Sequence, residues 1–308
     1  MRRLLPVVLL ATSIAFTACA TDGDDAGAPD DGSPAADKIA VTVGSADFGE
    51  ARILGEIYAQ ALEAEGFDVS KKLGLGARDV YIEALEEGEI DIVPEYTGNL
   101  LRFVTEEQDS PPTSQETYDA LEDALAERDL TALEPSDAED KDGVVVTEET
   151  ADRLDLEKVS DLADHARDLV FAGPPECREN PACLKGLQDV YGLDFKEFKS
   201  LAAGAPLVTA LKEGEVDAAN IFSTDGQIAA NDFVVLDDDK GIAGAQNVVP
   251  LLRADVLESS DEIAEILNEV SSKLTTESLT EMNKRVDIDK DDPDDVAGSW
   301  LRDNGFIT

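Results

Sequence analysis

The residues that most often carry enzymatic chemistry are scarce in this sequence. Histidine occurs once, as His165 in the polar stretch DLADHARD, so the usual general base is nearly missing. No glycine-rich phosphate loop, nucleophile elbow, zinc-ligand spacing or Ser/His/Asp set can be assembled. The sequence does not exclude a catalytic pair of carboxylates like that of glycosidases, because 69 acidic residues provide many such pairs along the chain. The composition therefore favours binding over catalysis, and we expect neither a metal nor a cofactor.

The N-terminus has the layout of a secretory signal. Arg2 and Arg3 precede an apolar run at 4–16, which is too short for a membrane-spanning helix. The run ends in FTAC, which resembles the site where bacterial lipoproteins are cleaved and acylated, so we expect a signal peptide over 1–18 and a lipid on Cys19. The alternative is cleavage by an ordinary signal peptidase, with Cys19 either removed or left without a role. Residues 19–37 lack large aliphatic side chains and are expected to form a flexible linker to the outer face of the membrane.

The other two cysteines, Cys177 and Cys183, flank the short segment RENPA. In an exported protein they should form a disulfide, and closing so small a loop stabilises the fold by about 2 to 3 kcal/mol. A metal site is the rival interpretation. It is poorly supported, because His165 lies in a polar helical stretch and no second pair of ligands is visible.

The charge of the chain is strongly negative. The 69 acidic residues face 25 basic ones, which gives a net charge of -44. Such a field repels nucleic acid and anionic lipid surfaces, so neither is expected as a partner. The acidic residues keep the surface hydrated, which would suit a saline environment. Alternatively, their field attracts cationic ligands.

From residue 38 onward, short apolar runs alternate with amphipathic helical stretches, which predicts an α/β fold with mostly parallel sheets. EALEEGEIDIVPEY at 83–96 and TALKEGEVDAANIF at 209–222 follow one design: a helix end, a glycine cap, and a strand that begins at an aspartate. This repetition predicts a second lobe built like the first. The expected strands lie at 39–43, 69–73, 91–93, 144–146, 169–173, 195–199, 216–221, 233–236 and 247–252, and the expected helices at 52–65, 79–87, 182–191, 260–273, 276–285 and 293–303.

The last three helices have no strands between them and must pack on a sheet formed earlier in the chain. We therefore expect lobe 1 to comprise 38–143 and 247–308, and lobe 2 to comprise 144–246. Two crossings between the lobes make a hinge, and a hinged pair of lobes places a ligand cleft between them.

Several segments in order resemble the osmoprotectant-binding proteins of ABC importers, the glycine betaine and choline type. They include the opening stretch from KIAVTVGSADFGE, GLGARDVYIEALEEGEIDIVPEYTGNLL with PEYTG at its centre, VVVTEETADRL, AGPPE, KGLQDVYGLDFKEF, FSTDGQI and FVVLDDDKG. The resemblance implies the type II periplasmic-binding-protein fold. It also implies a monomeric, non-enzymatic receptor that delivers a small cationic or zwitterionic solute to permease and ATPase subunits encoded elsewhere.

In this family a quaternary ammonium lies over aromatic rings. The resemblance makes Tyr96 of PEYTG one such ring, with a core tyrosine as the alternative. The other aromatic positions are lost in the alignment, because 140–143, Val208 and Gln246 occupy them. Ala46 and Asn180 likewise replace the usual cations that hold a ligand carboxylate.

Arg78 and Arg178 could compensate for the lost cations, with Arg78 the better candidate for gripping an anion. Arg78 could instead be a surface arginine paired with a carboxylate, and Asp225 could be no more than a helix cap. The expected lining of the cleft is Asp47, Arg78, Tyr96, Thr97, Asn99, Glu176, Asp225, Gln246 and Asn247.

This polar and acidic set leaves three hypotheses. The first is a receptor for a betaine-type osmoprotectant, and the second is a receptor for another cationic or zwitterionic solute, such as an amino acid derivative or ergothioneine. The third is a lipoprotein that senses or scaffolds without transport.

Overall fold

The computed structural model describes residues 39–106, 111 and 113–308. The predicted signal peptide, Cys19 and the linker lie outside the described residues. Within the described part of the chain, no helix combines the length and apolar character needed to cross a membrane.

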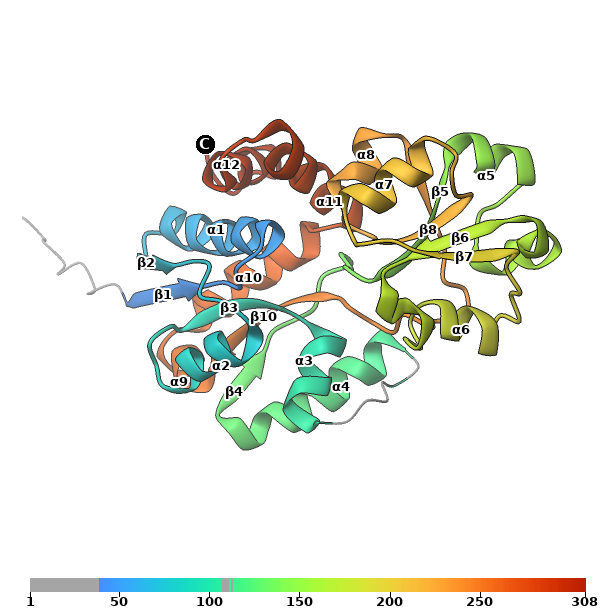
Figure 1. The fold of residues 1–308 in the computed structure, drawn as a ribbon. Coiled ribbons are helices and arrows are strands. Elements are labelled where there is room, and N and C mark those ends of the chain that lie inside the picture. The colour runs from blue at the N-terminus through green and yellow to red at the C-terminus, as the bar shows by residue number, and fades with distance from the viewer. Residues whose placement is uncertain (1–38, 107–110, 112) are drawn as a thin grey trace, which may run out of the picture. The chain divides into compact units, whose positions relative to one another are not determined.

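The first sheet has the strand order β2-β1-β3-β10-β4 (Figure 1). β1 runs parallel to β2 and β3, whereas β10 returns from far along the chain and pairs antiparallel with β3 and β4. The strands span β1 Ala40–Gly44, β2 Asp68–Lys72, β3 Ile92–Tyr96, β4 Leu130–Ala132 and β10 Val248–Arg253.

The second sheet repeats this plan with the order β7-β6-β8-β5-β9. β6 runs parallel to β7 and β8, and β5 lies antiparallel to β8 and β9. The strands span β5 Asp142–Thr147, β6 Val170–Gly173, β7 Glu197–Ser200, β8 Ala218–Phe222 and β9 Phe233–Leu236. This sheet begins two residues before the predicted lobe boundary at 144.

The two repeated sequence segments occupy matching places in the two sheets. Gly88 and Gly214 end their helices with φ values of +74° and +70°, a backbone conformation that favours glycine. The side chain of Asp91 then accepts a hydrogen bond from the amide of Thr42 at 2.8 Å, and that of Asp217 accepts one from Val170 at 2.8 Å. Each aspartate thereby helps to set the register of a parallel strand pair, which explains why this residue type directly precedes both β3 and β8.

The C-terminal helices pack on the first sheet and also reach the second. α1 carries a buried face of Ile53, Leu54 and Ile57 and lies against α12 (Figure 1). α11 packs against α8, which connects β8 and β9 of the second sheet. The helices span α1 Gly49–Ala64, α2 Arg78–Glu86, α3 Thr97–Thr105, α4 Ser114–Leu125, α5 Glu148–Leu154, α6 Leu184–Asp189, α7 Ala205–Lys212, α8 Gly226–Ala230, α9 Ala254–Ser259, α10 Asp261–Lys273, α11 Thr276–Lys284 and α12 Pro293–Asp303. Short 3-10 segments lie at Ala126–Arg128, Val159–Asp164, Ala166–Asp168 and Pro175–Arg178, and a π-helical turn lies at Arg285–Asp289.

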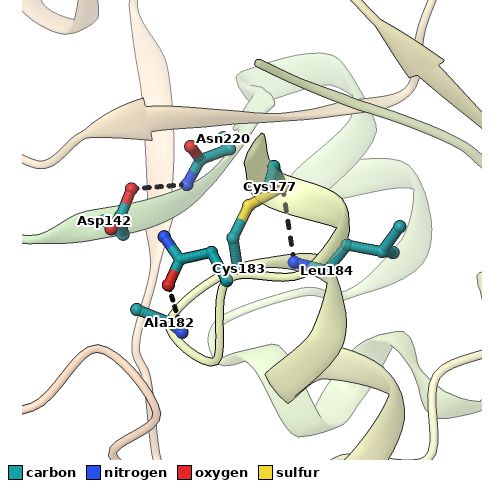
Figure 2. Close-up of a disulfide and its surroundings, with 7 residues drawn as sticks. Asp142, Cys177, Ala182, Cys183, Leu184 and Asn220 are labelled. Carbon is teal, nitrogen blue, oxygen red and sulfur yellow. Dashed lines mark hydrogen bonds between the residues drawn. A yellow bond between two sulfur atoms is a disulfide. The ribbon is translucent and has the colours of Figure 1, made fainter. Parts of the chain in front are cut away.

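The predicted disulfide between Cys177 and Cys183 is confirmed (Figure 2). Their Cα atoms lie 5.2 Å apart, and both side chains are buried. The amide of Leu184, the first residue of α6, donates to Cys177 Sγ at 3.3 Å. The bridge therefore anchors the start of α6 to the loop that follows β6.

Candidate functional site

A cavity of about 180 Å³ opens at the carboxyl ends of β6, β7 and β8. This edge is where open α/β sheets bind ligands. The antiparallel β5 begins at the same edge, so its first residue also faces the cavity. The lining residues are Asp142, Pro174, Glu176, Cys177, Asn180, Ala203, Gly204, Asn220, Ile221, Phe222 and Asp225.

Asp142 provides a carboxylate in this cavity. Asn220 Nδ2 donates to Asp142 Oδ1 at 3.1 Å (Figure 2). Burial raises the pKa of Asp142, while hydrogen bonds from Asn220 and Asn180 act in the opposite direction. Asn180, which replaces a usual cation of the family in the alignment, therefore supports an anion.

Phe222 supplies an aromatic ring to the cavity. Its side chain is 54% exposed although it is large and apolar. Val208, which occupies an aromatic-cage position in the alignment, is 6% exposed and belongs to the apolar core beside β8. The ring on this side of the site comes from the end of β8.

Glu176 and Asp225, two of the predicted site residues, both line the cavity. Asp225 Oδ1 also accepts from the amide of Gln227 at 2.8 Å and caps α8. Asp225 therefore both caps α8 and lines the cavity. Together with Asp142, these residues make the cavity acidic.

Tyr96 lies at the end of β3, at the carboxyl edge of the first sheet. Its ring is 6% exposed and stacks on Phe48 with a centroid distance of 6.4 Å. Its hydroxyl donates to Glu50 Oε1 at 2.5 Å. Phe48, the residue before α1, is 45% exposed and presents an aromatic ring that the sequence analysis did not consider.

Arg78 is engaged with Glu95, the acid of the PEYTG motif. Arg78 Nε and Nη2 donate to the two carboxylate oxygens at 2.7 and 3.1 Å. Glu95 is fully buried and also accepts from the Tyr81 hydroxyl at 2.6 Å and the Tyr96 amide at 2.8 Å. Arg78 therefore neutralises a buried carboxylate that holds the PEYTG segment in place.

Four other predicted site residues bind one another at the junction of β3, α3 and β10. Gln246 Oε1 accepts from the Asn99 amide at 3.0 Å, and Thr97 Oγ1 accepts from the Asn247 amide at 3.2 Å. Asn247 Nδ2 donates to the carbonyl of Ser136 at 2.9 Å. These contacts join segments 111 to 150 positions apart and shape the edge of the first sheet.

Asp47 is exposed and forms an ion pair with Arg52, with 2.5 Å between Oδ1 and Nη2. Ala46 beside it is buried. Arg178 is exposed, and its guanidinium lies 4.5 Å from the centroid of the Phe198 ring.

A buried acidic network connects the two sheets behind Tyr96. Glu50 accepts from Asn283 Nδ2 at 2.5 Å, and the same nitrogen donates to the carbonyl of Thr224 at 2.8 Å. Thr224 Oγ1 donates to Asp140 Oδ1 at 2.8 Å. Burial raises the pKa of Glu50, and burial together with the charge of Glu50 raises the pKa of Asp140 to about 7.

The sequence analysis did not single out Phe48, Phe222, Glu50 or Asn283. Phe222 directly follows the strand predicted at 216–221 and precedes a polar turn, which is a usable signal. Phe48 gives a weaker signal, because it lies five residues after the strand predicted at 39–43. Glu50 and Asn283 carry no such local signal, because their roles arise from contacts between distant segments.

In residues 39–106, 111 and 113–308, no group of three His, Cys, Asp or Glu side chains is placed to hold a metal ion. The two edges together offer carboxylates, amides and aromatic rings, which suits a polar cation or a zwitterion.

A family model described as the substrate-binding domain of ABC-type glycine betaine transport systems matches residues 39–303. The chain belongs to this family. A glycine-betaine-binding protein of Pseudomonas aeruginosa is 31% identical over 276 residues, covering 86% of this chain and 88% of that protein. The ergothioneine transport permease/ergothioneine binding protein EgtU of Helicobacter pylori is 26% identical over 263 residues, covering 83% of this chain and 46% of that protein.

Solved structures of family members share the fold. The apo structure of YehZ from Escherichia coli superimposes with a TM-score of 0.80 at 28% identity, covering 88% of this chain and all of that one. The type II periplasmic-binding-protein fold and the role of an ABC-importer substrate-binding protein, both implied by the resemblance, are thereby confirmed.

Proposed function

We propose that this substrate-binding protein holds a betaine-type quaternary ammonium solute between two lobes, and delivers it to its permease without catalysing a reaction. Lobe 1 comprises 38–143 and 247–308 and contributes Tyr96 and Phe48. Lobe 2 comprises 144–246 and contributes Phe222 and the acidic cavity. Ligand contacts both lobes only when they close, so binding shifts the population toward the closed form.

The observation that carries this proposal is the exposed ring of Phe222 in a cavity with the Asp142 carboxylate. An aromatic face attracts a quaternary ammonium by about 0.5 to 2 kcal/mol, and a nearby carboxylate adds an attraction for the same charge. Tyr96 and Phe48 provide a stacked aromatic pair on the other lobe.

The remaining predicted site residues take supporting roles in this proposal. Thr97, Asn99, Gln246 and Asn247 hold the lobe 1 edge and offer it polar groups, and Asp47 lies at its exposed rim. Glu176 and Asp225 face the ligand from lobe 2. Arg78 acts indirectly, by fixing Glu95 and hence Tyr96.

A second candidate ligand is another cationic or zwitterionic solute with hydrogen-bond donors, such as an amino acid derivative or ergothioneine. Three carboxylates in one cavity favour it, because a trimethylammonium group cannot donate conventional N–H hydrogen bonds to them. The named function of the Helicobacter pylori relative supports the same class.

Isothermal titration calorimetry of the mature domain with glycine betaine, choline, carnitine and ergothioneine tests both candidates. The Phe222→Ala and Tyr96→Ala variants should each weaken the best ligand about 2- to 30-fold. Val190→Ala, an exposed apolar side chain outside the cavity, is the control and should bind like the wild type. Unchanged affinity in both aromatic variants would refute the proposed site.

We also propose that the mature protein is a monomer anchored by a lipid on Cys19 to the outer face of the cell membrane. The FTAC sequence after the apolar run supports this location. The Cys19→Ser variant should leave the membrane fraction, whereas wild type should remain in it and yield a diacylglyceryl-modified N-terminal peptide by mass spectrometry.

A further inference from the structure

Arg102 is a half-buried arginine in α3, the helix that begins directly after Tyr96. Its Nε donates to the carbonyl of Gly98 at 3.3 Å, and its Nη2 donates to Asn99 Oδ1 at 3.3 Å. Both contacts draw the guanidinium toward the first turn of α3, at the ligand edge of the first sheet.

Arg102 differs from the other half-buried arginines in the described part of the chain. In the part of the chain that the structure describes, no carboxylate lies within 4 Å of its guanidinium, although acidic residues outnumber basic ones by 69 to 25. The half-buried Arg78, Arg253 and Arg285 each pair with a carboxylate. The described arginines that lack such a pair besides Arg102 are exposed: Arg153, Arg178 and Arg302. A half-buried guanidinium with two neutral partners keeps its capacity to bind an anion.

The hydrogen bonds to Gly98 and Asn99 hold Arg102 against the first turn of α3, directly after Tyr96. Burial and then the charge of Arg78 lower the pKa of Arg102, and the Asp142 carboxylate acts in the opposite direction. Asp142 lines the cavity at the edge of the second sheet. The opposite charges of Arg102, on α3, and Asp142, on β5, favour each other's ionised form.

We infer that Arg102 binds the carboxylate of a zwitterionic ligand, while the acidic cavity with Phe222 takes its cationic end. The inference rests on the proposed function and specifies the ligand class as a carboxylate-bearing cation. It also orients the ligand, with its anionic end toward α3 and its ammonium toward Asp142 and Phe222.

The other two arginines considered for this role are less suitable. Arg78 already binds Glu95 with two nitrogens, and turning it toward a ligand would leave that fully buried carboxylate without its cation. Arg178 is exposed and stacks on Phe198. Arg102 combines partial burial with a free anion-binding capacity.

The experiment compares two probes that share a trimethylammonium group and differ in the carboxylate. Glycine betaine and choline are titrated by calorimetry into the mature wild-type domain and into the Arg102→Gln, Arg102→Lys and Arg128→Gln variants. Arg128 forms an ion pair with Glu86 and is the matched control. Loss of a charge-assisted hydrogen bond should weaken betaine about 10- to 150-fold in Arg102→Gln, with choline changed less than about 2-fold.

Arg102→Lys should show an intermediate loss for betaine, because lysine keeps the charge without the planar fork. Arg128→Gln should bind both probes like the wild type. Equal weakening of both probes in Arg102→Gln, or no weakening of either, would overturn the role of Arg102.

The outcome for the wild type separates this inference from the proposed function. Binding of choline without betaine would overturn the inference and leave the aromatic site standing. If the wild type binds neither probe, nor carnitine nor ergothioneine, the proposed function fails and the inference fails with it. Urea unfolding of each variant verifies that the fold is intact.

Discussion

Asn283 and Glu50, 233 positions apart in the sequence, are joined by a hydrogen bond of 2.5 Å from Nδ2 to Oε2. Glu50 opens α1 on the first sheet, and Asn283 belongs to α11. Because the same nitrogen also reaches the carbonyl of Thr224 after β8, one amide links both halves of the molecule. Glu50 in turn holds the hydroxyl of Tyr96, so the link extends to the proposed ligand ring.

Replacing this amide should weaken the fold. Asn283→Ala removes the buried donor that Glu50 and the Thr224 carbonyl share, which should lower the free energy of unfolding by about 1 to 3 kcal/mol in urea denaturation. Asn304→Ala, which removes a donor to a carbonyl of its own helix, is the control and should cost less. Equal losses in the two variants would contradict the linking role of Asn283.

Stability should fall as the pH rises through the range in which Asp140 titrates. Its pKa is raised from 3.8 to about 7 by burial and the charge of Glu50, so the folded state binds a proton that the unfolded state releases near pH 4. The stabilisation from this proton is complete below pH 4 and is lost as the pH approaches and passes 7. The charge of nearby Asp142 acts in the same direction.

The test is urea denaturation of the wild type and Asp140→Asn between pH 5 and 8. The slope of the unfolding free energy against pH should be shallower in the variant, by at most about 1.4 kcal/mol per pH unit. Parallel curves would show that Asp140 does not hold the proton.

Replacing Arg78 should lower the free energy of unfolding far more than replacing an exposed arginine. Arg78→Ala strands the fully buried Glu95 without its cation, and we expect a loss of about 3 to 5 kcal/mol in unfolding free energy. Arg52→Ala breaks an exposed pair with Asp47 and should cost about 0 to 1 kcal/mol. The double variant Arg78→Ala/Glu95→Gln should regain part of the loss, since the stranded charge is then absent.

Reduction of the disulfide should destabilise the domain moderately. Cys177 and Cys183 close a loop of sequence separation 6, so dithiothreitol should lower the unfolding free energy by about 2 to 3 kcal/mol, measured by urea denaturation. A Cys177→Ser/Cys183→Ser variant should match the reduced protein and show no response to dithiothreitol. Thiol counting on the unfolded, unreduced mature domain should find neither cysteine free; two free thiols at these positions would disprove the bridge.

Local patterns in the sequence determined the fold class, the main strands and helices, and the disulfide. The repeated glycine and aspartate at 88 and 91, and at 214 and 217, predicted two matching sheets, because a left-handed cap and a register-setting carboxylate act within a few residues. Residues 97–132 were left unassigned in the sequence analysis, and the structure places α3, α4 and β4 there.

Tertiary structure decided which of the candidate site residues are free for a ligand. PEYTG pointed to Tyr96, yet only the fold shows that Arg78 is taken by Glu95 while Arg102 lacks a carboxylate partner among the described residues. The buried Val208 and exposed Phe222 are both apolar residues in the sequence. Their difference arises because burial depends on packing between segments distant in the chain, and periodicity records only neighbours along it.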